Sequence, residues 1–216
     1  MKVLDNIVFR LQKAGGISKY WAETTKRIDK NDSNILFYES IAAKSNLFRS
    51  ELNYKHSIMI DSGSTWISRL RSPKISAEVF HSSYYRVSAL AKSNVVTIHD
   101  FMNEKFVRSY RDIILSRQKK WACKHADIVV TVSKKTRDDL LEFYPFVKPK
   151  NVHVVYNGVD ERFYPEKFNK PFSLEGKYLQ EREFFLYVGN RGYCKNFPFV
   201  LDFLGEAWAQ GLRHPL

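Results

Sequence analysis

The stretch "DIVVTVSKKTRDDL", Asp127 to Leu140, decides the fold class of this chain. It begins with a run of mostly β-branched apolar residues, Asp127 to Val132, which is typical of a buried strand. Ser133 follows, and a serine at this position can cap the N-terminus of a helix. That helix is predicted to run to about Tyr144, because Pro145 comes next. The stretch therefore predicts a strand that leads directly into a capped helix.

The same alternation of strand-like and helical patterns extends along most of the chain. Two apolar stripes at helical spacing comprise Ile17, Tyr20, Trp21, Thr24 and Ile28, and Val107, Tyr110, Ile114 and Trp121. Further strand-like runs cover Val3 to Leu11, Ile35 to Tyr38, Ala77 to Phe80, Val95 to His99, Val152 to Tyr156 and Phe184 to Val188. In several runs both the odd and the even positions are apolar, as in a sheet covered on both faces. We therefore predict an α/β fold, a Rossmann-like doubly wound parallel sheet.

The segment from Asn157 to Glu183 interrupts this alternation. It contains Gly158, Pro165 and Pro171 among charged and aromatic residues, without a clear period. Such a segment is typical of an interdomain connection. We therefore predict one domain over residues 1–156, a connection over 157–183, and an incomplete second α/β unit over 184–216.

The stretch "FFLYVGNRGYCKN", Phe184 to Asn196, opens this second unit. Five apolar residues run into Gly189, and Arg191 and Lys195 follow before Asn196 opens an apolar-periodic helix. This pattern predicts a buried strand, a turn and a helix start. Because helix N-termini attract anions and two cations can neutralise a diphosphate, the pattern favours a phosphate site.

The overall charge also favours anionic partners. The chain of 216 residues carries a formal net charge of +12, with a pI near 9.6. Such a surface suits nucleic acid, acidic lipid or phosphorylated small molecules, and the charge alone does not choose among them. No stretch is apolar over the roughly 18 residues that a membrane span needs.

The N-terminal stretch and the cysteines point to a cytoplasmic protein. Asp5, Arg10 and Lys13 stand where a signal peptide would need a clean apolar run. Cys123 and Cys194 form neither a disulfide framework nor a zinc spacing. We interpret them as ordinary thiols in a reducing compartment.

Two short motifs are candidates for ligand contact. Gly15 and Gly16 lie between the first strand and the first long helix, where they would let a ligand approach the backbone; a tight turn is the alternative. His99 and Asp100 end a strand, where open α/β sheets bind ligands. His99 could hydrogen-bond a sugar hydroxyl, or be satisfied by local backbone, and Asp100 could cap a turn. His81 occupies a comparable strand end.

A basic helix is predicted over Arg111 to Asp127. Its charged residues and one interleaved aromatic are Arg111, Arg117, Lys119, Lys120, Lys124 and Trp121. Basic amphipathic helices bind anionic membrane surfaces, although a solvated face gives the same pattern.

Five motifs in this order resemble the retaining glycosyltransferases of GT-B fold in glycosyltransferase family 4. They are "GGISKYW" (Gly15 to Trp21), "VVTIHD" (Val95 to Asp100), "ADIVVTVSKKTRDDL" (Ala126 to Leu140), "NVHVVYNGVDERFYP" (Asn151 to Pro165) and "LYVGNRGYCKN" (Leu186 to Asn196). The resemblance covers the family's N-terminal, acceptor-side domain and the entry to its C-terminal, nucleotide-sugar-binding domain.

The resemblance implies a role for each candidate residue. Gly15 and Gly16 would approach the donor diphosphate from the N-terminal side, and His99 would contact the donor sugar. Lys195 would neutralise the diphosphate. Arg191 would be its partner, although it follows Gly189 by two residues where many members have the arginine one residue after the glycine.

The resemblance further implies a nucleotide sugar as donor, a lipid-linked or saccharide acceptor, and no cofactor or divalent metal. The setting that it suggests is assembly of bacterial surface polysaccharide, such as O-antigen, capsule or lipopolysaccharide. A peripheral position on the inner face of the cytoplasmic membrane would fit the basic helix. The family's pair of glutamates separated by seven residues is missing, since Glu206 stands alone. We therefore expect a fragment of a hexosyltransferase-type enzyme that is inactive by itself, through a natural truncation or otherwise.

Two other functions fit parts of the sequence. A non-catalytic binding module could retain the acceptor domain, and an intact downstream reading frame with the glutamate pair would argue against it. A basic nucleic-acid-binding α/β protein would explain the charge, but the sequence has no recognisable nucleic-acid-binding module, so no nucleic-acid partner is expected.

Overall fold

The computed structural model describes residues 1–63, 69–107, 109–161, 163–164, 172–174, 176–179, 184–189, 191 and 195–211. The chain forms two compact units, Met1–Gly158 and Val159–Leu216. None of the described helices combines the length and apolar character that crossing a bilayer requires.

The first unit is built on a seven-stranded sheet in which every neighbouring pair is parallel. The strands follow the order β3-β2-β1-β4-β5-β6-β7 across the sheet. Their bounds are β1 (Lys2–Asp5), β2 (Ile35–Glu39), β3 (Ile58–Ile60), β4 (Ala77–Ser82), β5 (Ala91–Ile98), β6 (Ile128–Thr131) and β7 (Val152–Val154). This order confirms the predicted Rossmann-like α/β fold.

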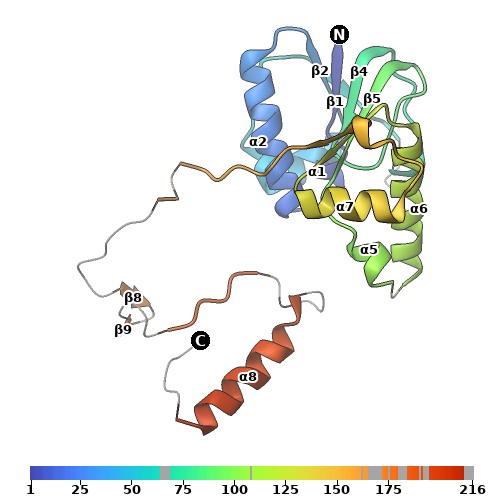
Figure 1. The fold of residues 1–216 in the computed structure, drawn as a ribbon. Coiled ribbons are helices and arrows are strands. Elements are labelled where there is room, and N and C mark those ends of the chain that lie inside the picture. The colour runs from blue at the N-terminus through green and yellow to red at the C-terminus, as the bar shows by residue number, and fades with distance from the viewer. Residues whose placement is uncertain are drawn as a thin grey trace. The chain divides into compact units, whose positions relative to one another are not determined.

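Helices connect these strands (Figure 1). They are α1 (Val8–Leu11), α2 (Gly16–Asn31), α3 (Leu47–Ser50), α5 (Met102–Lys105), α6 (Tyr110–His125) and α7 (Lys134–Phe143), with 3-10 turns η1 (Ile41–Ser45) and η2 (Pro149–Asn151). As predicted, α7 begins after Ser133, whose hydroxyl accepts a hydrogen bond from the Thr136 amide at 3.0 Å. The cap satisfies one of the amides left open at a helix start.

The sheet is covered on both faces. Leu4 and Phe37 are register partners, and both pack with buried residues of α1 and α2. The register aligns Leu4, through β4, with Val95, so Val96 and its partner Val129 point to the opposite face. Those two valines pack with buried residues of α6 and α7. Figure 1 shows α2 and α6 on opposite sides of the strands, which explains why the strands are apolar on both parities.

Two details of the first unit differ from the sequence prediction. The run Val3 to Leu11 is not one strand, because β1 ends at Asp5 and α1 begins at Val8. The amide of Val8 donates to the hydroxyl of Ser83, at 3.0 Å, so the chain turns over the end of β4 instead of extending. The short edge strand β3 was missed because its three exposed residues carry no alternation.

The second unit contains a two-stranded antiparallel sheet and one long helix in its described part. Strands β8 (Phe172–Leu174) and β9 (Lys177–Leu179) pair within the predicted connection, on either side of Gly176 at φ 80°. Helix α8 (Phe197–Ala209) confirms the apolar-periodic helix. The predicted boundaries 1–156, 157–183 and 184–216 stay a prediction about functional domains.

The predicted strand from Phe184 to Val188 is wrong. No residue of this run is in a strand, and Leu186 and Val188 are largely exposed. A strand needs a neighbouring strand to pair its backbone N–H and C=O groups. Within the described part of the second unit, only β8 and β9 pair, and they pair with each other.

Candidate active site

The candidate site lies at the carboxyl ends of β1, β4 and β5. β1 pairs with β2 on one side and with β4 on the other, so the strand order reverses at β1 and β4. Open α/β sheets bind ligands in the crevice at such a switch point. The segments that follow β1 and β5 carry Gly15, Gly16 and His99. Arg10, Arg69 and Arg111 line a pocket at the same edge of the sheet, and sequence patterns did not indicate a site for Arg10 and Arg69.

Gly15 and Gly16 form the start of α2. Gly15 is the residue before the helix and has an extended backbone, φ 172°. The side-chain amide of Gln12 folds over this helix start, where its Oε1 accepts a hydrogen bond from the Ser18 amide at 3.2 Å. A Cβ on Gly15 would lie 2.7 Å from that oxygen, whereas a Cβ on Gly16 would meet nothing within 4 Å. A side chain at Gly15 would therefore have to displace the flexible end of Gln12, whereas Gly16 leaves the backbone open.

The electrostatics of this helix start favour an anion. The first turn of α2 contains no acidic residue, and the unpaired amides and dipole of a helix N-terminus attract negative charge. The neutral Oε1 of Gln12 accepts a hydrogen bond from one of these amides, that of Ser18. An anion could take over the same amide after a change in the Gln12 rotamer.

His99 follows β5 and lies against α2. Its ring packs edge-on against the ring of Tyr20, with centroids 5.0 Å apart, one turn of α2 after Gly16. The His99 carbonyl accepts a hydrogen bond from Thr136, and its Nε2 is buried with no hydrogen-bond partner in the described part of the chain. Burial lowers the pKa of His99 to about 4, so the imidazole is neutral at pH 7. The structure thus brings His99 beside the first turns of α2, where Gly15 and Gly16 lie.

The neighbouring polar residues have structural roles. Asp100 accepts a hydrogen bond from the Met102 amide at 3.1 Å, which confirms the predicted turn cap. His81 is hydrogen-bonded to the Thr97 hydroxyl at 2.9 Å and packs against Trp21, and burial lowers its pKa to about 4. His81 therefore serves the interior of the domain.

Arg191 and Lys195 belong to the second unit. The Arg191 guanidinium lies over the ring of Phe197, 5.0 Å from its centroid. Lys195 is exposed, just before Asn196, which adopts a left-handed conformation (φ 48°) at the start of α8. Gly189 has φ 150°, a conformation that favours glycine. Both cations thus lie next to a helix start, as predicted, but without the predicted preceding strand.

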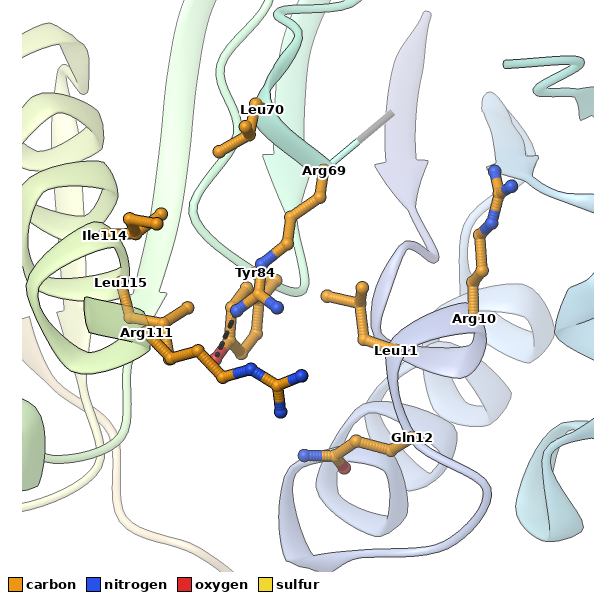
Figure 2. A pocket seen from close by; sticks show the side chains of 9 residues that line it. All are labelled: Arg10, Leu11, Gln12, Arg69, Leu70, Tyr84, Arg111, Ile114 and Leu115. Carbon is orange, nitrogen blue, oxygen red and sulfur yellow. Dashed lines mark hydrogen bonds between the residues drawn. The ribbon is translucent and has the colours of Figure 1, made fainter. Parts of the chain in front are cut away.

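A pocket of about 470 Å³ opens at the switch point (Figure 2). Arginines from three parts of the first unit line it: Arg10 from α1, Arg69 from the chain before β4, and Arg111 from α6. The Arg10 guanidinium points away from the other two and donates to the Gly63 carbonyl at 2.9 Å (Figure 2). Sequence reasoning missed Arg10 and Arg69, because single arginines far apart in the chain form no pattern. The remaining lining residues are Leu11, Gln12, Leu70, Tyr84, Ile114 and Leu115.

The basic helix α6 needs one correction. Lys119 is fully buried, and its ammonium group contacts the carboxylate of Glu104 at 2.7 Å and the carbonyl of Asp100 at 2.8 Å. Lys119 also lies over the ring of Phe101, 4.6 Å from its centroid. Its charge is therefore part of the core, whereas Arg111, Arg117, Lys120 and Lys124 are exposed.

The described residues offer neither a reactive thiol nor a metal-binding group. Burial raises the pKa of Cys123 to about 12, so it behaves as a core residue; Cys194 lies outside the described residues. The described residues contain no group of three or more His, Cys, Asp or Glu placed to hold a metal ion.

Comparison with known sequences adds one match. Residues 14–163, more than half of the chain, match the sequence model of Glycosyltransferase Family 4. The matched range contains Gly15, Gly16 and His99, and it ends before Arg191 and Lys195. No curated protein matches the chain.

Proposed function

Because the chain belongs to glycosyltransferase family 4, we propose that it transfers a sugar from a nucleotide diphosphate with retention of anomeric configuration. The pathway that we propose is assembly of bacterial surface polysaccharide, such as O-antigen, capsule or lipopolysaccharide. The observation that supports a donor site is the contact between Tyr20 and His99, which sets an imidazole beside the start of α2.

In this proposal the start of α2 approaches the donor diphosphate. Gly16 offers backbone without a side chain in the way, since a Cβ there would meet nothing. The phosphate oxygens replace the Gln12 oxygen at the helix start. Arg191 and Lys195 supply positive charge to the leaving diphosphate, and such charge stabilisation dominates phosphate departure.

His99 contacts the donor sugar in this proposal. A buried imidazole with a pKa near 4 stays neutral, so it accepts or donates a hydrogen bond without adding charge. Its Nε2 has no partner in the described part of the chain. A sugar hydroxyl would satisfy this atom, which is costly to leave buried and unpaired.

The acceptor is a lipid-linked or other saccharide, and the chain works in the cytoplasm at an anionic membrane surface. The exposed face of α6 supports the membrane contact: it carries Arg117, Lys120 and Lys124, with Trp121 at 42% exposure. Each basic residue near an acidic surface adds about 1 kcal/mol. Co-sedimentation with vesicles should rise with anionic lipid and fall with salt.

The test is a sugar-transfer assay with the full-length gene product. Nucleoside diphosphate release is measured from a panel of nucleotide sugars, with bacterial lipid extract as the acceptor source, and the product's anomeric configuration is read by NMR. His99→Ala should lower the rate at least about tenfold, the effect of losing one good hydrogen bond. His125→Ala, at an exposed histidine of α6, is the matched control. Inactivity of the full-length gene product across the panel would overturn the proposal.

A further inference from the structure

We infer that the arginine pocket binds the phosphate group of an acceptor that carries an apolar chain. This inference rests on the proposed function, and it names the chemical class of the acceptor. Two arginines, Arg69 and Arg111, point into the pocket of about 470 Å³, and no aspartate or glutamate lines it. Arginine suits this task because its planar guanidinium binds phosphate oxygens in pairs.

Arg69 is held in place by neutral partners. Its Nε lies 3.4 Å from the Gln118 oxygen, one terminal nitrogen lies 3.5 Å from the Tyr84 hydroxyl, and the guanidinium lies over the Tyr84 ring. Figure 2 shows the bond to Tyr84 and the Arg111 guanidinium pointing into the same space. The partners orient Arg69 but leave its charge uncompensated.

No ion pair in the described part of the chain involves Arg69 or Arg111. Elsewhere in the same unit, the buried cations Arg49, Arg86 and Lys119 are each paired with a carboxylate. Clustered cations repel one another, and an anion between them removes that repulsion. The pocket therefore lacks the negative charge that a phosphate would supply.

Most of the remaining lining residues are apolar, and this decides what the phosphate is attached to. Leu11, Leu70, Ile114 and Leu115 line the pocket, and Leu70 is 59% and Ile114 44% exposed. Apolar surface of this kind gains about 25 cal/mol per Å² when it is covered. Inorganic phosphate or a sugar phosphate would leave it in water, whereas an attached hydrocarbon chain would cover it.

The location links this pocket to sugar transfer. Gln12 lines the pocket and also caps the start of α2, so the pocket adjoins the Gly15–Gly16 turn. An acceptor whose phosphate lies between the arginines would hold its adjoining sugar close to that turn. The same arginines would otherwise serve the donor diphosphate, and the experiment separates the two.

The probe is decyl phosphate below its micelle concentration, with binding to the 216-residue chain measured by calorimetry. The double substitution Arg69→Ala and Arg111→Ala should weaken binding at least about tenfold, because it removes the charged hydrogen bonds that the two guanidinium groups donate to the phosphate. Lys26→Ala with Lys30→Ala removes the same charge from exposed positions late in α2 and should change affinity less than about twofold. Ile114→Asp, at an exposed position, should also weaken binding and avoids any question of folding.

Inorganic phosphate should bind at least about tenfold more weakly than decyl phosphate, since only the decyl chain covers the apolar walls. Decyltrimethylammonium should not compete. Equal losses in the arginine and lysine variants, or equal binding of both decyl compounds, would overturn the inference. Displacement by a nucleoside diphosphate, lost in the arginine variant, would assign the pocket to the donor instead and also overturn it.

These outcomes are independent of the proposed function, because the binding assay needs no sugar donor. If the chain binds decyl phosphate through Arg69 and Arg111 but transfers no sugar, the inference about the pocket holds and the proposed function is wrong. If the chain glycosylates a neutral saccharide but does not bind decyl phosphate, the proposed function holds and the inference is wrong.

Discussion

The guanidinium of Arg86 donates two hydrogen bonds to the carboxylate of Asp5, which lies 81 residues earlier at the carboxyl end of β1. The Arg86 and Asp5 side chains are 3% and 0% exposed, and Arg86 also pairs with Asp61 at 3.1 Å. This cluster joins the segments that follow β1, β3 and β4. It therefore fixes the edge of the sheet on which the candidate site is built.

Removing Arg86 should destabilise the first unit strongly. Arg86→Met leaves two buried carboxylates without their cation, which costs about 3–5 kcal/mol. Urea denaturation followed by circular dichroism measures this loss. Arg137→Ala is the control, since the Arg137 side chain is 39% exposed and its contact with Asp138 is long, at 3.9 Å. Its effect should stay within about 0.5 kcal/mol. Similar midpoints for the two variants would contradict a structural role for the Asp5 cluster.

Lys119 should behave as a core residue and not as a membrane ligand. Lys119→Met leaves the carboxylate of Glu104, 5% exposed, without its cation, so stability should fall by about 3 kcal/mol. Binding of the folded variant to anionic vesicles should not change. Lys120→Ala, at the exposed neighbouring position, should show the reverse: unchanged stability and weaker vesicle binding. Comparing the two by urea denaturation and vesicle co-sedimentation tests the correction made to the basic helix.

Much of the fold could be predicted because its signals are local. The β-branched runs, the cap at Ser133 and the stripe through Trp21 each lie within one short window of sequence, and the structure confirms them. The strand predicted at Phe184 to Val188 failed because strand formation depends on a partner that the window does not contain.

For the same reason, only part of the candidate site could be predicted from the sequence. The contact between Tyr20 and His99 and the pocket formed by Arg10, Arg69 and Arg111 join residues that are far apart in the chain. Only the strand order brings them together. The pairing of Lys119 could not be predicted, because residue type alone does not distinguish a buried lysine from an exposed one. Its partner Glu104 also lies on another helix.

His81 should make stability depend on pH. Burial lowers its pKa from 6.5 to about 4, so the unfolded chain takes up a proton at a higher pH than the folded chain. The stabilising contribution is complete above pH 6.5 and is lost as the pH falls towards 4. The loss is on the order of 3 kcal/mol. His81→Gln should flatten this part of the stability curve in urea denaturation between pH 7 and 4. An equally steep curve in the variant would show that His81 does not contribute.

Lys195 should bind the diphosphate of the proposed sugar donor. It is exposed next to the start of α8, where an anion is favoured. Lys195→Ala should weaken nucleoside diphosphate binding by about 1.5–3 kcal/mol, the range for a charged hydrogen bond. Arg191→Ala should have a related effect, moderated by the packing of Arg191 on Phe197. Calorimetry with the full-length gene product measures both effects, and an unchanged affinity for Lys195→Ala would refute its assignment.

Gly15 and Gly16 should respond in opposite ways to the same substitution. Gly15→Ala places a methyl group 2.7 Å from the Gln12 oxygen, so Gln12 must leave the Ser18 amide, and losing this cap costs about 1 kcal/mol. Gly16→Ala meets nothing within 4 Å and should stabilise α2 by about 0.5 kcal/mol. Urea denaturation of each variant gives the sign.

The effect of Gly16→Ala on nucleotide binding distinguishes two roles for this turn: binding of the donor, or chain reversal alone. A methyl group at Gly16 stands where the donor diphosphate would approach the backbone, so nucleoside diphosphate affinity in the complete protein should fall although the fold becomes more stable. Gln12→Ala removes the same cap without adding bulk, so Gly15→Ala on that background should add little further destabilisation. If Gly16→Ala raised stability and left nucleotide affinity unchanged, the start of α2 would be a turn required only by packing, and the donor would have to bind elsewhere.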